Sequence, residues 1–276
     1  MDVLITGWGC PPLDEAVLAA APRLRAALHS AGSVKALVTP ACWERGLLIS
    51  SAADANAVPV AEYTVGAVLL AGKGVFALRD DYRRRRGFTL GAVQPSVGNY
   101  GRRVGIVGAS RIGRRVLELL APHDLELCLY DPYTQVDGVR QVGLDELLRT
   151  CDIVSLHAPA NDETRHMIDR DRLALMPDGA VLVNTARGSL VDTDALVAEL
   201  TAGRLSAVLD VTEPEPLPSD SPLFDLPNAF ITPHVAGSQG NELARMGTAV
   251  LDELERLIAG FPLAHQVRHD DLDRVA

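Results

Sequence analysis

Short apolar runs alternate with stretches of helical periodicity along most of the chain. The clearest apolar runs are RVGIV from Arg103, LELCLYD, DIVSLHAP, AVLVNTARG, AVLDV and AFITPH. The helical patterns between them are IGRRVLELLA, LDELLRT, DRLALM and DTDALVAELTAG. Parallel strands need crossover connections and are buried on both faces. The order of these segments therefore predicts an α/β fold with a doubly wound parallel sheet, which we place in residues 74–236.

The rest of the chain predicts a second, smaller α/β domain formed by residues 1–73 and 237–276. Its expected elements are strands at Val3–Thr6 and Ala36–Thr39, a helix over Leu13–Leu28, a long helix from Val60 and a returning helix over Asn241–Ala259. We expect a ligand cleft between the two domains.

Charge and composition favour a small-molecule ligand. The net charge of −10 argues against binding to nucleic acid, which needs clustered Lys and Arg. The cysteines (Cys10, Cys42, Cys128 and Cys151) lack CxxC spacing, so we expect no disulfide framework and a reducing cytoplasm. The longest apolar stretch carries Glu62 and Lys73, and the first residues lack a basic region, so we expect neither a membrane span nor an export signal.

The segment Gly108-Ala-Ser-Arg-Ile-Gly113 lies where a predicted strand passes into a helix. At the start of that helix the amides of Arg111 and Ile112 would face a pyrophosphate, and Gly113 would let helix and strand pack closely. Asp131, at the end of the next strand, would bind a ribose hydroxyl and repel a 2′-phosphate. This pattern predicts a dinucleotide site that prefers NAD to NADP.

Some positions near this turn have a structural interpretation as well as a cofactor-binding one. Ser110 replaces the second glycine of the usual motif, so its side chain would lie close to the pyrophosphate, and a turn without a ligand is the alternative. His157 and Pro159 follow a central predicted strand, where they could contact the cofactor or only support the fold.

Polar clusters stand at the ends of three successive predicted strands, at Asn184–Gly188, in DVTEPEP from Asp210 and in the segment that ends at His234. In a doubly wound sheet these ends face the ligand crevice. The planar fork of Arg187 suits a substrate carboxylate, and His234 suits proton transfer near neutrality. A carboxylate beside His234 would fix its tautomer; Glu215 is the first candidate and Glu213 the second. Each side chain could instead have a purely structural role.

These motifs resemble the D-isomer-specific 2-hydroxyacid dehydrogenase family. The similar segments are NAVPVAEYTVG, VGIVGASRIG, LYDPY, SLHAP with ETRHMID, LMPDGAVLVNTARGSLVD, AVLDVTEPEPLP and LPNAFITPHVAG. The resemblance implies a Rossmann NAD domain beside a flavodoxin-like domain. It also implies hydride transfer between nicotinamide and C2 of a small 2-hydroxy or 2-oxo acid. It implies further that Arg187, Glu215 and His234 are the catalytic residues, and that Arg187 and His234 also contact the cofactor and the substrate.

The resemblance implies the remaining ligand contacts too. Asp210 would lie by the nicotinamide carboxamide, and Thr185 and Ala186 would line the same end of the cofactor. Gly237, the last residue of the ITPHVAG motif, would also contact the cofactor. The loop Ala31-Gly32-Ser33-Val34 would bind the substrate carboxylate through backbone amides, with an ordinary turn as the alternative. A homodimer through the NAD domain is also expected.

The chain departs from the family before the long helix, where its N-terminal segment is shorter. We expect the first βα units to be missing, which would remove one wall of the substrate cleft and leave a sheet edge that needs cover. Two other functions stay open, an NAD-binding regulatory protein of this fold and a dehydrogenase of another small anion such as formate or phosphite. We expect no metal site, because His265 and His269 have no carboxylate cluster beside them.

Overall fold

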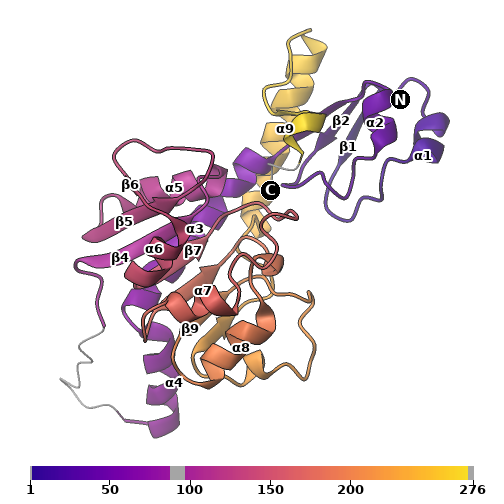
Figure 1. Ribbon diagram of the computed structural model, residues 1–276. Helices are drawn as coiled ribbons and strands as arrows, with labels where there is room; N and C mark the ends of the chain where they lie inside the picture. Colours follow the sequence, from indigo (N-terminus) through magenta and orange to yellow (C-terminus); the bar gives the residue numbers. More distant parts are fainter. Residues whose placement is uncertain (1, 88–96, 273–276) are drawn as a thin grey trace. The chain divides into compact units, whose positions relative to one another are not determined.

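The computed structural model describes residues 2–87 and 97–272 (Figure 1). The chain forms two compact units, one from residues 1–59 and 237–276 and the other from residues 60–236. The first boundary lies inside α3 (Ala53–Gly72), whereas the sequence analysis placed it at the end of this helix. The reason is packing, since α3 buries Ala61 and Val68 in one core with Ile106 of the larger unit.

The larger unit contains a parallel sheet with the strand order β10-β9-β8-β7-β4-β5-β6 among the described residues. Its strands are β4 (Arg102–Val107), β5 (Leu125–Tyr130), β6 (Arg140–Gln141), β7 (Ile153–Leu156), β8 (Val181–Asn184), β9 (Ser206–Leu209) and β10 (Ala229–Ile231). This order confirms the doubly wound fold class. The edge strand β6 was not predicted, because two residues are too few to show a period.

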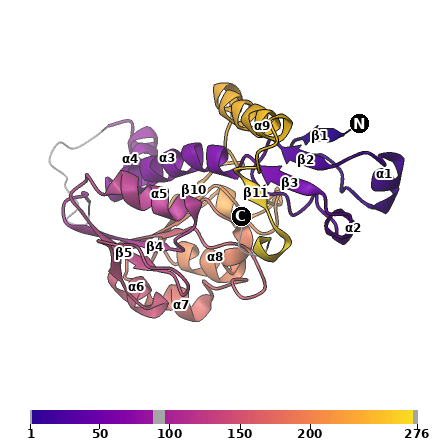
Figure 2. The same cartoon turned by 90° about the horizontal axis from the view of Figure 1, so that it is seen from above.

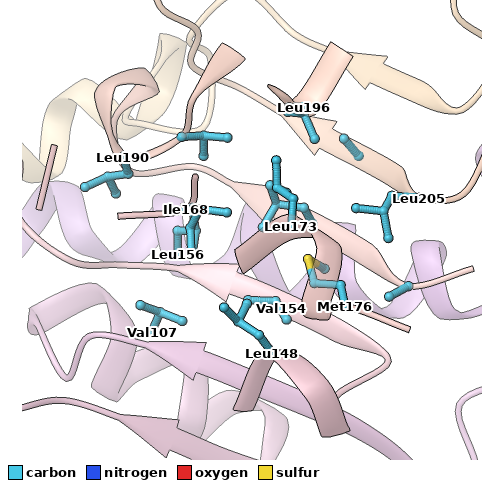
Figure 3. Close-up of a cluster of buried hydrophobic side chains, with 14 of the residues drawn as sticks. Val107, Leu148, Val154, Leu156, Ile168, Leu173, Met176, Leu190, Leu196 and Leu205 are labelled. Atoms are coloured by element: carbon cyan, nitrogen blue, oxygen red, sulfur yellow. The ribbon is translucent and has the colours of Figure 1, made fainter. Parts of the chain in front are cut away.

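Helices cover both faces of this sheet, as the apolar runs required (Figure 2). They are α4 (Val75–Arg85), α5 (Arg111–Leu120), α6 (Leu144–Thr150), α7 (Arg170–Leu175) and α8 (Thr193–Thr201). Helices α3, α4 and α5 pack on one face and α6, α7 and α8 on the other. Neighbouring residues of β7 point to opposite faces of the sheet. Ile153 packs in the core with α3, α4 and α5, whereas Val154 and Leu156 pack in the core with α6, α7 and α8, which is shown in Figure 3. Burial of both faces explains the continuous apolar runs in the sequence.

The smaller unit has a sheet with the order β1-β2-β3-β11. Its elements are β1 (Val3–Thr6), α1 (Glu15–Ala20), β2 (Ala26–His29), α2 (Pro40–Glu44), β3 (Leu48–Ser51), α9 (Leu243–Ile258) and β11 (Gln266–Val267). Strands β1 to β3 are parallel and β11 is antiparallel to β3. In the described part of the chain, β1 forms one edge.

Two predicted elements of the smaller unit are wrong. The expected helix over Leu13–Leu28 stops at Ala20, and Ala26–His29 forms a strand whose residues are all buried between β1 and β3. The expected strand Ala36–Thr39 is a turn, in which the amides of Leu37 and Val38 both donate to the carbonyl oxygen of Val34. Short apolar runs do not distinguish buried strands from helices or turns, and sheet pairing decides.

Helix α3 is long and apolar enough to cross a membrane, judged by length and composition only. A core helix passes the same test. Here Ala61, Thr64 and Val68 are fully buried within the larger unit. The expectation that the chain does not enter a membrane stays a prediction.

Candidate active site

The strand-to-helix turn after β4 depends on two glycines. Gly108 has a φ of +101°, and a Cβ there would lie 2.7 Å from the backbone nitrogen of Ala158. A Cβ on Gly113 would lie 2.0 Å from the carbonyl oxygen of Gly108. Any larger residue would therefore push α5 away from the end of β4, so the motif predicted from the sequence is required by the local geometry.

Ser110 is the N-cap of α5. Its Oγ accepts a hydrogen bond from the amide of Gly113 at 3.2 Å, as expected for a serine that precedes the first helical turn. The serine in place of glycine therefore stabilises the helix start. Arg111 is the exposed first residue of α5, and the side chain of Ile112 packs against the core shared with α3.

The carboxylate of Asp131 holds the end of β5 against the glycine turn. Its Oδ2 accepts from the amide of Ala109 at 2.7 Å, and its Oδ1 accepts from the amides of Tyr133 and Thr134, each at 2.8 Å. An anionic oxygen thus lies directly beside the turn, where the sequence analysis expected it. Carboxylate oxygens have lone pairs for further donors, so a ribose hydroxyl fits this position.

His157 lies behind the same turn. Its Nε2 pairs with Oγ of Ser155 at 2.9 Å, and burial lowers its pKa to about 3, so the ring is neutral near pH 7. Within residues 2–87 and 97–272, Nδ1 has no hydrogen-bond partner. The buried neutral ring supports the fold at this turn, and the cofactor contact of His157 stays a prediction. The carbonyl oxygen of Pro159 accepts from Thr164 Oγ1 at 2.6 Å, which orders the loop after β7.

The end of β8 is fixed by buried polar contacts. Asn184 donates through Nδ2 to the carbonyl oxygen of Arg187 and accepts through Oδ1 from the amide of Ala186. The hydroxyl of Thr64 donates to a carbonyl oxygen of its own helix, so Thr185 is the donor in the 2.8 Å bond between their hydroxyls. Thr64 was not identified from the sequence, where a polar residue within an apolar helix was the available signal.

The guanidinium of Arg187 is partly buried at this strand end. Its Nη1 donates to the carbonyl oxygen of Ala186 at 2.6 Å. Burial lowers the pKa of Arg187, and the negative charge of Glu215 acts in the opposite direction. A cation that water solvates poorly gains more from an anionic ligand. The environment of Arg187 therefore suits a carboxylate.

The structure decides between the two glutamates that were candidates for the partner of His234. Oε1 of Glu215 lies 2.6 Å from Nδ1 of His234, and the side chains are 43% and 50% exposed. Glu213 instead pairs with Arg165 and His166. Glu215 is thus the carboxylate that fixes the tautomer of His234, with Nδ1–H donating and Nε2 left for proton exchange.

Asp210 is buried at the end of β9 and bonds to the loop that carries His234. Its Oδ1 accepts from Thr232 Oγ1 at 2.6 Å and from the amide of Val235 at 2.8 Å. Since Thr232 donates to Asp210, Tyr63 of α3 is the donor in the 2.7 Å bond between Tyr63 and Thr232. Thr232 belongs to the polar cluster expected at this strand end, whereas Tyr63 was not identified from the sequence, although it stands within the quoted family motif NAVPVAEYTVG.

The predicted carboxylate loop and Gly237 belong to the smaller unit. Ala31 is buried, and its carbonyl oxygen accepts from the amide of Ala52 at 3.0 Å. Ser33 Oγ accepts from the amide of Lys35 at 3.3 Å. A Cβ on Gly32 or on Gly237 would lie 3.4 Å and 3.2 Å, respectively, from atoms of the Asn56 side chain, so these glycines share one neighbour. The substrate role of the loop stays a prediction.

The described residues contain no group of three or more His, Cys, Asp or Glu side chains that could hold a metal ion. Nδ1 of His265 pairs with Asp54 Oδ2 at 2.7 Å. His269 lies in a short 3-10 helix with its ring against Trp43.

A family model described as D-isomer specific 2-hydroxyacid dehydrogenase, NAD binding domain, matches residues 65–236. The chain belongs to this family. The resemblance found in the sequence is therefore confirmed, and the residues around the glycine turn, β8 and β9 lie within the matched range.

Similar proteins include two kinds of enzyme. The chain is 32% identical over 273 residues to a D-3-phosphoglycerate dehydrogenase of Methanocaldococcus jannaschii, covering 94% of this chain and 50% of the relative. It is 34% identical to a glyoxylate reductase of Korarchaeum cryptofilum, covering 88% of this chain and 76% of the relative. The chain thus spans about half the length of the phosphoglycerate dehydrogenase that it matches.

The fold also agrees with solved structures. The TT0316 protein from Thermus thermophilus superimposes with a TM-score of 0.83 at 31% identity, covering 96% of this chain and 85% of that chain. Family and fold class are therefore established by sequence and by structure.

Proposed function

We propose that the protein is an NAD-dependent oxidoreductase acting between a 2-hydroxy acid and the corresponding 2-oxo acid. The observation that carries the proposal is the 2.6 Å bond between Glu215 and His234 in the unit that also contains Arg187 and the glycine turn. A histidine oriented by a carboxylate is a general acid/base, and the matched family is one of 2-hydroxyacid dehydrogenases.

The residues of the larger unit fit a dinucleotide. The turn between Gly108 and Gly113 has room for no side chain at either glycine, and Asp131 places an anionic oxygen beside it. The first turn of α5 would bind the pyrophosphate, with Arg111 and Ile112 supplying amides. Thr185, Ala186 and Asp210 would face the nicotinamide end. When bound, the nicotinamide supplies the hydride acceptor or donor.

The proton moves through His234. With Nδ1–H donated to Glu215, Nε2 can take the proton of a substrate hydroxyl during oxidation. In reduction the imidazolium returns this proton to the oxygen at C2, and Glu215 stabilises the positive ring. Arg187 binds the substrate carboxylate, which holds C2 in place.

NAD is proposed over NADP because the carboxylate of Asp131 would repel a 2′-phosphate.

A homodimer through the larger unit is proposed from the family resemblance alone. Light scattering coupled to size-exclusion chromatography measures the mass in solution. A mass equal to one chain at micromolar concentration would remove the dimer from the proposal.

The function is tested by following the absorbance of NADH with purified protein, as NADH is consumed with a panel of 2-oxo acids and as it is formed from NAD+ with formate or phosphite. For an active substrate, we expect His234→Ala and Arg187→Ala to lower kcat/KM by at least about a hundred-fold. The exposed positions His123 and Arg149 provide the controls His123→Ala and Arg149→Ala, which should keep wild-type rates.

The other outcomes are distinct. Turnover of formate or phosphite alone would identify a dehydrogenase of another small anion. Binding of NADH without turnover of any panel member would favour the regulatory alternative. Undiminished turnover in His234→Ala would refute the assigned acid/base.

A further inference from the structure

The loop after β9 carries two glutamates, and each holds a different histidine. Glu215 pairs with His234, as described above. Both carboxylate oxygens of Glu213 are also engaged: Oε1 lies 2.7 Å from Nη1 of Arg165, and Oε2 lies 2.7 Å from Nε2 of His166. One residue, Pro214, separates the two glutamates. The direction of the Glu213 side chain therefore limits where the Glu215 side chain, two positions later on this short loop, can point.

The two residues that contact the Glu213 carboxylate are themselves tied to the segment after Arg187. The amide of His166 donates to the carbonyl oxygen of Ser189 at 2.7 Å, and the amide of Ile168 donates to that of Leu190 at 3.0 Å. The loop that supplies Arg165 and His166 is thus fixed to the same chain segment that follows Arg187.

The backbone of the glutamate loop is fixed to that segment as well. Thr193 Oγ1 donates to the carbonyl oxygen of Glu213 at 2.7 Å. A Cβ on Gly188 would lie 2.1 Å from the carbonyl oxygen of Thr212, so these two backbones are in direct contact. The backbone contacts set the position of Glu213, and its ion pairs set the direction of its side chain.

We propose that Arg165 and His166 are positioning residues, which act through Glu213 to hold Glu215 in line with Nδ1 of His234. The proposal rests on the function proposed above, because it concerns the same acid/base pair. The hydrogen bond from His166 is the largest of the effects that lower the pKa of Glu213, so its carboxylate stays ionised at neutral pH. The side chains of Arg165, His166 and Glu213 are 56%, 38% and 30% exposed, so the cluster contributes little to stability, and its effect is on orientation.

The direct test reads the tautomer of His234 without any substrate. Long-range ¹H–¹⁵N spectra at alkaline pH distinguish Nδ1–H from Nε2–H imidazole, and the signals of His234 are those absent from His234→Gln. In the wild type we expect the Nδ1–H form, because Glu215 accepts that proton. In Glu215→Ala the proton should distribute over both nitrogens.

Glu213→Ala should move the His234 signals towards those of Glu215→Ala, whereas Glu213→Gln, which keeps an acceptor for His166, should stay closer to wild type. Glu146→Ala removes another exposed ion pair, with Arg140, and should leave His234 unchanged. His166→Asn should keep the loop backbone unstrained, because asparagine tolerates the φ of +49° at this position. Its side chain is shorter than that of histidine, so it should lose the contact with Glu213. Unchanged His234 signals in both Glu213→Ala and His166→Asn would overturn the proposal.

Kinetics separates positioning from a role in folding. With an active substrate, we expect Glu213→Ala to lower kcat about three- to ten-fold while the KM for NADH and the melting temperature stay near wild type. A wild-type protein without turnover would refute the proposed function only, because the tautomer experiment still decides this inference. A fall in melting temperature with an unchanged tautomer would show a purely structural role and contradict it.

Discussion

The backbone amide of His234 donates to the carbonyl oxygen of Asp210 at 2.9 Å, while the carboxylate of the same Asp210 accepts from the amides of Val235 and Ala236. One buried aspartate thus shapes the loop on which the proposed acid/base stands. The positive φ of His234, +54°, is held by these bonds.

Asp210→Asn should therefore affect both stability and catalysis. The new amide group places N–H against a backbone N–H, so one acceptor is lost in a buried site, which costs about 1–3 kcal/mol. We expect urea unfolding to show this loss and kcat to fall with it. Asp225→Asn, at an exposed position, is the control and should change neither. An Asp210→Asn variant of wild-type stability would show that the carboxylate is not needed to hold the loop.

Gly113 and Gly66 differ in the room that each has for an added Cβ, so they should respond oppositely to alanine. At Gly113 the new Cβ would lie 2.0 Å from a backbone oxygen, so Gly113→Ala should displace α5, lower the melting temperature and weaken NADH binding. At Gly66, inside α3, an added Cβ would have no atom within 4 Å apart from its chain neighbours and the nearby backbone of its own helix, and alanine should stabilise the helix by about 0.5–1 kcal/mol. Calorimetry and a fluorescence titration with NADH measure both effects. Equal effects at the two positions would refute the close packing.

Acid should destabilise the larger unit through His157. Burial lowers the pKa of this histidine from 6.5 to about 3, so the unfolded chain binds a proton that the folded ring refuses. The stability contributed by neutral His157 is complete above pH 6.5 and declines as the pH falls towards 3, by up to about 1.4 kcal/mol per pH unit. The free energy of unfolding, measured in urea at several pH values over this range, should change less steeply with pH for His157→Gln than for wild type. The exposed control His123→Gln should keep the wild-type slope.

Cofactor preference should depend on Asp131. Asp131→Asn removes the charge but keeps one acceptor oxygen for the surrounding amides, so we expect the ratio of kcat/KM for NADH to that for NADPH to fall by about ten-fold or more. The exposed Asp137 offers the control Asp137→Asn. If there is no turnover, dissociation constants for the two cofactors serve instead. A ratio unchanged in Asp131→Asn would place the selectivity elsewhere.

The sequence determined the larger unit well because its signals are local. Runs such as LELCLY and DIVSLHAP are apolar throughout, since each strand packs on helices at both faces. The turn from Gly108 to Gly113 was predictable because a close backbone approach tolerates only glycine there. Parallel strands place their carboxyl ends together, so Arg187, Glu215 and His234 were expected at one edge of one sheet.

Only the tertiary structure distinguished segments and side chains whose local sequence patterns are alike. Ala26–His29 and Ala36–Thr39 are both short apolar runs, and only pairing with β1 and β3 made the first of them a strand. Glu213 and Glu215 are the same residue type two positions apart, so residue type alone does not separate their partners, and only the family resemblance singled out Glu215 in advance. His166 comes from a loop 47 residues before Glu213, and this long-range pairing is what leaves Glu215 to His234. Residue type and period are properties of the chain, whereas the choice of partner depends on which segments the fold brings within hydrogen-bond distance.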